Sequence, residues 1–233
     1  MTARYDAVAE FYEVGWPDFY DDEVSIALFD LVGTVDGLAV LDLGCGHGRM
    51  SRELARRGAH VVGIDISEVL LERARLLEAD DPLAIEYRRG DAAIPTTLEG
   101  QRFDMVVCSM ALADIDDLDG ALTTIAGALN TGAFFVFSLL HPCFPGGEHV
   151  SASWSSSKRY YDEGWWSADG ESSTLRQQVG ANHRMLSTYL NALARHRLAL
   201  DELREPLPPE GWTQDKPEAA ARPVFLVGRF RKI

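Results

Sequence analysis

The stretch LAVLDLGCGHGRM at residues 38–50 combines glycines and a carboxylate in a pattern suited to holding a small molecule. Its first half is an apolar run with the length and β-branched content of a buried strand. Gly44, Gly46 and Gly48 follow on alternate positions, and glycine both removes the Cβ atom and permits backbone conformations closed to other residues. We therefore expect a ligand to approach the backbone at this turn.

Three aspartates are expected at the carboxyl ends of three successive strands. Asp42 lies just before the glycine turn, Asp65 lies 19 residues after Gly46, and Asp91 ends a third strand-like run. Ligands of open α/β sheets bind at this edge, and an acid about 20 residues after the glycines accepts from the ribose hydroxyls. Asp91 is placed to accept from an adenine amino group while the Ala92 amide meets a ring nitrogen. Each aspartate alone could equally cap a helix, but together they predict a nucleoside site.

The glycine spacing and the charge of Asp42 separate two kinds of nucleotide. The dinucleotide fingerprint GxGxxG beginning at Gly44 requires a glycine at position 49, where this chain has Arg49. A carboxylate at Asp42 would repel a pyrophosphate and attract an ammonium group. S-adenosylmethionine, with an adenosine end and a cationic amino-acid end, meets both demands. An NAD-dependent oxidoreductase is the alternative from the same fold.

Alternating strand and helix patterns predict the fold class. We expect an α/β fold with a Rossmann-like, doubly wound, seven-stranded sheet that is mostly parallel and has an antiparallel last strand. The expected strands are residues 38–43, 60–66, 84–91, 103–110, 132–140, 198–206 and 222–232. The expected helices between them are residues 48–58, 67–80 (with Ser67 as its N-cap), 117–129 and 182–197.

The whole chain, residues 1–233, is expected to form a single domain. Residues 1–35 are expected to form a helical lid, 38–140 the cofactor-binding core, 141–180 an insertion after strand five, and 181–233 a last helix with two strands. The lid helices place Tyr5 and Tyr12 on one face, together with Val8, Ala9 and Trp16. That face either docks on the core or lines a substrate pocket.

Composition limits the partners. The formal net charge of −14 opposes binding to nucleic acid and to anionic membranes, and the only basic cluster, Arg52, Arg56 and Arg57, is interpreted as a solvated helix face. The apolar run at 132–140 is too short to cross a bilayer, which needs about 20 residues. The first residues do not read as a secretory signal, and three cysteines without a CxxC pair suit a reducing compartment. A cytoplasmic protein, monomeric or homodimeric, is expected.

The insertion at residues 141–180 is rich in proline, glycine, serine and tryptophan. We interpret it as a long irregular lid, because a disordered segment rarely keeps so many aromatic residues. Its aromatic residues either form a wall for a flat or apolar acceptor or pack the insertion onto the body. These residues are Trp154, Tyr160, Tyr161, Trp165 and Trp166.

The stretches VLDLGCGHGR, VVGIDIS, RRGDA and FDMVVCSMALADIDD resemble the class I S-adenosylmethionine-dependent methyltransferases, in particular the type 11 small-molecule group. The resemblance implies S-adenosyl-L-methionine as cofactor and S-adenosyl-L-homocysteine as product. It assigns Asp42, Gly44, Gly46 and Arg49 to the methionine end of the cofactor, and Tyr12 and Cys45 are also expected at the cofactor site. It further assigns Asp65 and Ile66 to ribose and adenine, Asp91 and Ala92 to adenine, and Cys108, Ser109 and Met110 to the wall beside the sulfonium. Many relatives have a histidine pair where this chain has Ala113 and Asp114, so a base cannot be carried over from that pair.

Three residues are candidates for removing a proton from the acceptor. His141 directly follows the fifth strand, His183 is expected to begin the helix after the lid, and Asp114 follows the fourth strand. A histidine titrating near neutrality suits this role, whereas a helix-terminal His183 or a capping Asp114 would be structural. Cys45 with His47, and His141 with Cys143, lack the four-ligand spacing of zinc sites, so no metal is expected.

The sequence thus predicts a methyltransferase that acts on an O, N or C atom of a small, apolar or aromatic acceptor. The alternative from another class is a non-catalytic module that binds the same cofactor as a sensor.

Overall fold

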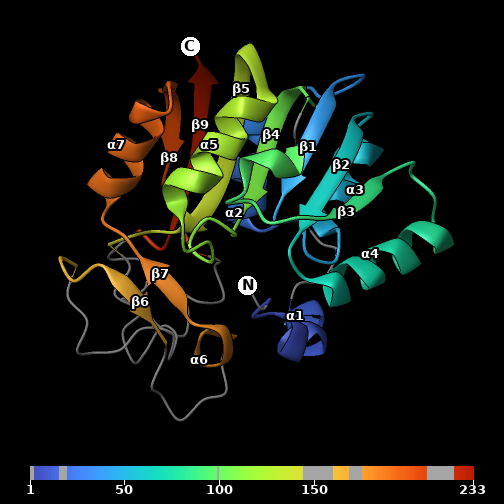
Figure 1. The fold of residues 1–233 in the computed structure, drawn as a ribbon, viewed down its shortest axis with the longest axis horizontal. Helices are drawn as coiled ribbons and strands as arrows, with labels where there is room; N and C mark the ends of the chain where they lie inside the picture. Colours follow the sequence, from blue (N-terminus) through green and yellow to red (C-terminus); the bar gives the residue numbers. More distant parts are fainter. Residues whose placement is uncertain (1–2, 16–19, 99, 144–159, 168–174, 209–222) are drawn as a thin grey trace.

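The computed structural model describes residues 3–15, 20–98, 100–143, 160–167, 175–208 and 223–233, with the side chains of residues 13–15 left out (Figure 1). Its centre is one seven-stranded sheet in the order β3-β2-β1-β4-β5-β9-β8. The strands are β1 (Ala39–Leu43), β2 (His60–Asp65), β3 (Glu86–Arg89), β4 (Phe103–Ser109), β5 (Leu129–Leu140), β8 (Leu198–Arg204) and β9 (Phe225–Lys232). The first five run parallel, and β9 pairs antiparallel with both of its neighbours. The predicted fold class is confirmed.

The antiparallel strand lies inside the sheet. β9 pairs with β5 through Phe137↔Gly228 and with β8 through Leu203↔Gly228. A Cβ atom added to Gly228 would lie 2.9 Å from the Leu203 side chain and 3.0 Å from the Phe137 ring. The absence of a side chain at Gly228 therefore lets large residues of both neighbouring strands pack against β9.

Helices cover both faces of the sheet because successive strand residues point to opposite sides. Leu41 and Leu43 face one apolar cluster, which includes residues of α5 (Leu118–Ala128) and α7 (Leu186–Arg195). Val40 faces a second cluster, which includes residues of α2 (Glu23–Val32), α3 (Arg49–Arg56) and α4 (Glu68–Asp80). The predicted cap is confirmed, since the Leu70 amide donates to the Ser67 hydroxyl at 3.1 Å.

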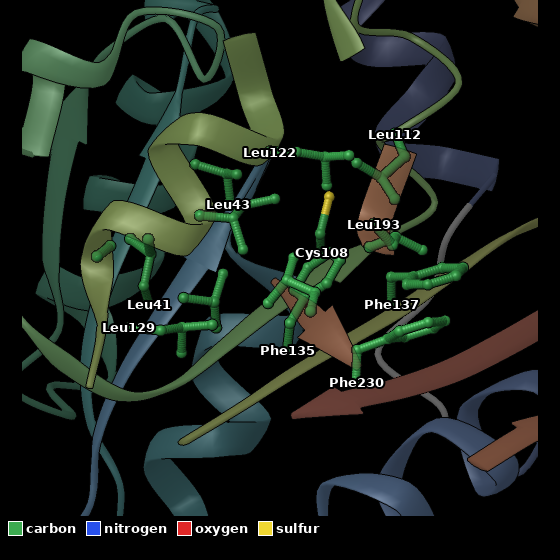
Figure 2. Close-up of a cluster of buried hydrophobic side chains, with 14 of the residues drawn as sticks. Leu41, Leu43, Cys108, Leu112, Leu122, Leu129, Phe135, Phe137, Leu193 and Phe230 are labelled. Carbon is green, nitrogen blue, oxygen red and sulfur yellow. The ribbon is translucent and has the colours of Figure 1, made fainter. Parts of the chain in front are cut away.

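Figure 2 shows the first cluster, in which Phe135, Phe137 and Phe230 lie below residues of α5. The Phe137 and Phe230 rings stack with centroids 5.8 Å apart. Cys108, at the centre of the view, is fully buried in the same cluster. These contacts hold β4, β5 and β9 together directly beneath the carboxyl edge of the sheet.

One basic residue of the predicted solvated face is buried. Arg52 is only 3% exposed, and its guanidinium pairs with Asp81 at 2.6 Å and with Glu78 at 3.4 Å. The interpretation of Arg52 as a surface charge was therefore wrong: it links α3 to the end of α4. Arg56 and Arg57 are exposed, as expected.

Smaller elements gather at the carboxyl edge of the parallel strands, in the lower part of Figure 1. They are η1 (Asp6–Val8), α1 (Ala9–Gly15), β6 (Gly164–Trp166), α6 (Leu175–Val179) and β7 (Ala181–His183). The prediction of N-terminal helices is confirmed, but the insertion is not irregular throughout. β6 and β7 form a two-stranded antiparallel sheet, so His183 ends a strand and α7 begins only at Leu186. A strand of three residues is too short to give a sequence pattern.

Among the described residues, no helix combines the length and the apolar character needed to cross a bilayer.

Candidate cofactor site

A cavity lies at the carboxyl edge of β1, β2, β3 and β4, beside α1, α6 and the segment before η1. It is lined by backbone and side chains from seven separate parts of the sequence. The predicted site residues among its lining are Tyr12, Gly44, Gly46, Asp65, Ile66, Asp91, Ala92, Ser109, Met110 and Asp114. A smaller cavity adjoins it and shares Tyr12, Gly44, Ser109 and Met110, while adding Asp42, Cys45 and Arg49.

The glycine turn is shaped by left-handed backbone. Gly44, Gly46 and Gly48 have φ values of 76°, 57° and 88°, which residues with a side chain rarely adopt. A Cβ atom on Gly44 would lie 2.5 Å from the Ala111 side chain, and one on Gly48 would lie 2.3 Å from the Tyr87 hydroxyl. The turn therefore brings bare backbone to the cavity wall and allows α3 to begin at once.

Asp65 is fixed by backbone amides at the centre of the cavity wall. Its carboxylate accepts from the Gly46 amide and from the Ser67 amide, both at 2.8 Å. Burial raises the pKa of Asp65, and the two amide bonds work against that rise. Each carboxylate oxygen keeps a further lone pair, so Asp65 can accept from the two hydroxyls of a ribose.

Asp42 offers a buried acceptor in the smaller cavity. It is 1% exposed, and the Ser51 hydroxyl donates to its Oδ2 at 2.5 Å. Its Oδ1 has no hydrogen-bond partner among the described residues. Burial raises the pKa of Asp42 to about 7, and the charge of Asp65 contributes to the rise. A cationic ligand group would satisfy Oδ1 and restore the ionised form, so this residue fits the ammonium of the expected cofactor.

Asp91 closes the adenine end of the cavity. Its Oδ1 accepts from the Ala93 amide at 2.9 Å, and its carbonyl accepts from the Thr97 hydroxyl at 3.0 Å. These bonds hold the loop after β3 in a tight turn. The second carboxylate oxygen and the Ala92 backbone remain at the cavity, where an adenine ring would meet them.

Of the predicted cofactor residues, Cys108 lines neither of these two cavities. Cys108 points into the core, because it alternates with Val107 and Ser109 on β4. The expectation that its side chain forms the wall beside the sulfonium is therefore not met, whereas Ser109 and Met110 line both cavities. Arg49 lies at the smaller cavity, with its guanidinium 4.3 Å from the Tyr20 ring centroid and 3.7 Å from Asp22.

Comparisons with known proteins agree with this geometry. A family model described as a methyltransferase domain, of type 11, matches residues 41–137. The crystal structure of an S-adenosylmethionine-dependent methyltransferase from Mesorhizobium loti is 31% identical, with a TM-score of 0.70, and the match covers 91% of this chain and 98% of that one. The chain belongs to the S-adenosylmethionine-dependent methyltransferases. The cofactor of this family is S-adenosyl-L-methionine, as predicted.

Curated relatives match over about half of this chain. A ubiquinone biosynthesis O-methyltransferase from Hahella chejuensis is 34% identical over 137 residues, which are 59% of this chain and 56% of that protein. One from Bordetella avium is 33% identical over 112 residues, which are 48% of this chain and 46% of that protein. The chain thus spans about half the length of the curated relatives it matches.

The two candidate histidines of this methyltransferase lie outside the main cavity. His141 is 2% exposed; its Nε2 lies 2.9 Å from Glu205 Oε1, and its Nδ1 accepts from the Cys143 amide at 3.0 Å. Burial lowers the pKa of His141. His183 is 3% exposed, and its Nε2 contacts the Tyr160 carbonyl at 2.7 Å. Both histidines line a second small cavity, and their catalytic role stays a prediction.

The predicted aromatic wall is not at the main cavity in the described part of the chain. Trp166 is buried beside Ala181 and lines the second small cavity instead. Tyr160 accepts from the Leu186 amide, and Tyr161 is 79% exposed. Trp154 lies outside the described residues, as does Trp16. Tyr160 and Trp166 therefore pack the insertion onto the body, whereas Tyr161 does not.

The main cavity is also lined by Arg4, Tyr5 and Arg176, which were not predicted as site residues. Arg4 and Tyr5 come from the segment before η1, and Arg176 comes from α6. The shared helix face of Tyr5 and Tyr12 was a usable signal for the first segment. Nothing in the sequence around Arg176 distinguishes it, because its position depends on the path of the insertion.

Proposed function

We propose that this chain transfers a methyl group from S-adenosyl-L-methionine to a small-molecule acceptor. One observation carries the proposal: the main cavity and its smaller neighbour bring the glycine turn, Asp42, Asp65 and Asp91 into one connected site. Asp42 would bind the ammonium group, Asp65 the ribose and Asp91 the adenine. When bound, the cofactor supplies an electrophilic methyl group on its sulfonium.

The expected chemistry is an in-line displacement. The acceptor atom would bond to the methyl carbon as the sulfur–carbon bond breaks, the electron pair would stay with sulfur, and the acceptor's proton would pass to water. Alignment of the two reactants supplies much of the acceleration, up to about 7 to 11 kcal/mol in intramolecular systems. The chain's contribution is therefore to orient the reactants and to exclude water beside α1, α6 and the segment before η1.

We further propose a hydroxyl oxygen as the acceptor atom. The curated relatives from Hahella chejuensis and Bordetella avium are named ubiquinone biosynthesis O-methyltransferases. Their similarity covers only about half of each chain, so amine and carbon acceptors belong in the same screen.

The test has a binding stage and a turnover stage. Calorimetric titration with S-adenosylmethionine, S-adenosylhomocysteine and NAD is expected to give micromolar binding of the first two, lost in Asp65→Ala, and no binding of NAD. Transfer of labelled methyl to a panel of hydroxyl, amine and carbon-acid compounds follows. Binding without transfer to any of them would favour a sensor, and binding of NAD alone would favour an oxidoreductase.

A further inference from the structure

Two segments from distant parts of the chain cover the main cavity, and one carboxylate holds both of them. Asp114 lies in the loop after β4 and lines the cavity. The Tyr5 hydroxyl donates to Asp114 Oδ2 at 2.8 Å, and the Arg176 guanidinium pairs with Asp114 Oδ1. The loop is thus tied to the segment before η1 and to α6 at the same side chain.

Burial makes this junction stronger than a surface ion pair. The side chains of Asp114 and Arg176 are 18% and 9% exposed, so water screens their attraction little. Arg176 also donates to the Gly180 carbonyl at 2.8 Å, which fixes the end of α6. Burial and the Asp114 charge raise the pKa of Tyr5, so its hydroxyl stays a proton donor. Displacing either segment would leave a buried charge or donor without its partner.

A second junction beside the first ties the segment before η1 to the same loop after β4. The Arg4 guanidinium donates to both Asp116 carboxylate oxygens, at 2.7 and 2.8 Å, and to the Asp114 carbonyl at 3.0 Å. It also lies 3.9 Å from the centroid of the Trp165 ring in β6. Arg4 and Asp116 are about one-third exposed, and exposed pairs contribute little. This junction therefore orients the segment, while Asp114 carries most of the attraction.

We propose that Asp114 is a positioning residue that holds Tyr5 and Arg176 over the bound cofactor and so sets the rate at which the nucleoside product leaves. Both carboxylate oxygens are engaged, which suits an anchor better than the proton acceptor expected from the sequence. The two segments share one anchor, so they open together. The inference rests on the proposed function only in that the cavity takes the adenosyl cofactor.

The deciding measurement is the dissociation rate of S-adenosylhomocysteine, followed by stopped-flow displacement. Tyr5→Phe removes one hydrogen bond to a charged group and is expected to raise this rate about 10-fold. Asp114→Asn keeps an acceptor for Tyr5 but loses the charge that holds Arg176, and is expected to raise the rate further. The matched control Tyr161→Phe removes a hydroxyl from an exposed ring of the insertion and should leave the rate unchanged.

Two measurements distinguish a positioning role of Asp114 from a role as a general base. In a double-mutant cycle, the effects of Tyr5→Phe and Asp114→Asn should be non-additive, because the Tyr5 hydroxyl donates to the carboxylate whose charge Asp114→Asn removes. In a single-turnover assay, Asp114→Asn should keep the pH dependence of methyl transfer, whereas loss of a general base would remove the ionisation that depends on it. Loss of that pH dependence with unchanged release rates would overturn the inference.

The outcomes also separate this inference from the proposed function. Tight binding to the unaltered protein with unchanged release from Tyr5→Phe and Asp114→Asn overturns the inference alone. If the unaltered protein binds no S-adenosylhomocysteine, the proposed function fails and the inference fails with it. Should Asp114→Asn not fold, Tyr5→Phe decides.

Discussion

Cofactor affinity is expected to depend on pH through Asp42. Its pKa of about 7 in the free protein reflects burial, and an ammonium group beside Oδ1 would bring the pKa down. Below about pH 7 the ligand must displace a proton before it can pair with the carboxylate. About nine-tenths of Asp42 is ionised at about pH 8 and about one-tenth at about pH 6. The affinity for S-adenosylhomocysteine should therefore fall about 10-fold, or about 1.4 kcal/mol, when the pH is lowered from about 8 to about 6.

Isothermal titration calorimetry tests this directly. Titrations in buffers of different ionisation enthalpy should show release of nearly one proton per ligand at about pH 6 and of almost none at about pH 8. Methylthioadenosine lacks the amino-acid end and serves as the ligand control, with an expected affinity independent of Asp42. Asp42→Asn should bind S-adenosylhomocysteine more weakly at about pH 8 and without this pH dependence. If the affinity for methylthioadenosine changed equally with pH, the assignment to Asp42 would be refuted and Asp65 would become the titrating group.

The raised pKa of Asp42 also predicts how the stability of the cofactor-free protein depends on pH. A carboxyl whose pKa is higher in the folded state binds more protons there than in the unfolded chain, so stability falls as pH rises between the two pKa values. The pKa of Asp42 is about 7 in the folded protein and has an ordinary value of 3.8, so the loss of stability reaches at most about 4 kcal/mol. Asp42→Asn should therefore be more stable than the unaltered protein at about pH 8, as measured by urea unfolding. Equal stability there would show that Asp42 ionises without cost.

Three further predictions concern packing and the histidine. Arg52→Ala should lower the free energy of unfolding by about 1 to 3 kcal/mol, because it removes the buried cation between α3 and α4. The control Arg57→Ala, at an exposed side chain, should change the free energy of unfolding by less than about 0.5 kcal/mol. Urea titration compares the two variants, and equal losses would count against the burial argument. Gly48→Ala should lower the melting temperature and weaken cofactor binding, since the φ of 88° and the nearby Tyr87 hydroxyl leave no room for a Cβ atom. The control Gly127→Ala has open space around it and should be neutral or stabilising. His141→Ala should lower turnover by about 100-fold or more at nearly unchanged cofactor affinity, as expected for loss of a base; a lower melting temperature with methyl transfer kept within a few-fold would make the role of His141 structural.

The residues of the cofactor site could be predicted because their positions depend on local sequence patterns. Strand ends, the glycine turn and the Ser67 cap depend on residues close in sequence, and they position Asp65 and Asp91 as expected. Even the misplaced Cys108 obeys a local rule, since the two-residue period of β4 sends it to the core with Val106. Alternation along that strand would have predicted it.

The surroundings of His141, Arg176 and Arg52 could not be predicted because they depend on contacts between residues far apart in the sequence. His141 meets Glu205 across 64 residues, and Arg176 meets Asp114 across 62. Three-residue strands such as β6 and β7 leave no periodic signal, and Arg52 is buried only because Glu78 and Asp81 of α4 lie against it. Such pairings follow from the completed fold and not from composition or spacing.

The place of β9 between β5 and β8 has a consequence for how the chain is made. Residues 141–224 leave the ribosome after β5 and before the strand that pairs with it. During that interval the five parallel strands can assemble, but the outer edge of β5 carries unpaired backbone groups beside Phe135 and Phe137. Open apolar edges of this kind invite pairing with other chains. Slow translation between β5 and β9, or a mutation that delays β9 docking, would therefore show as aggregation of newly made chains and not as lower stability of the finished protein.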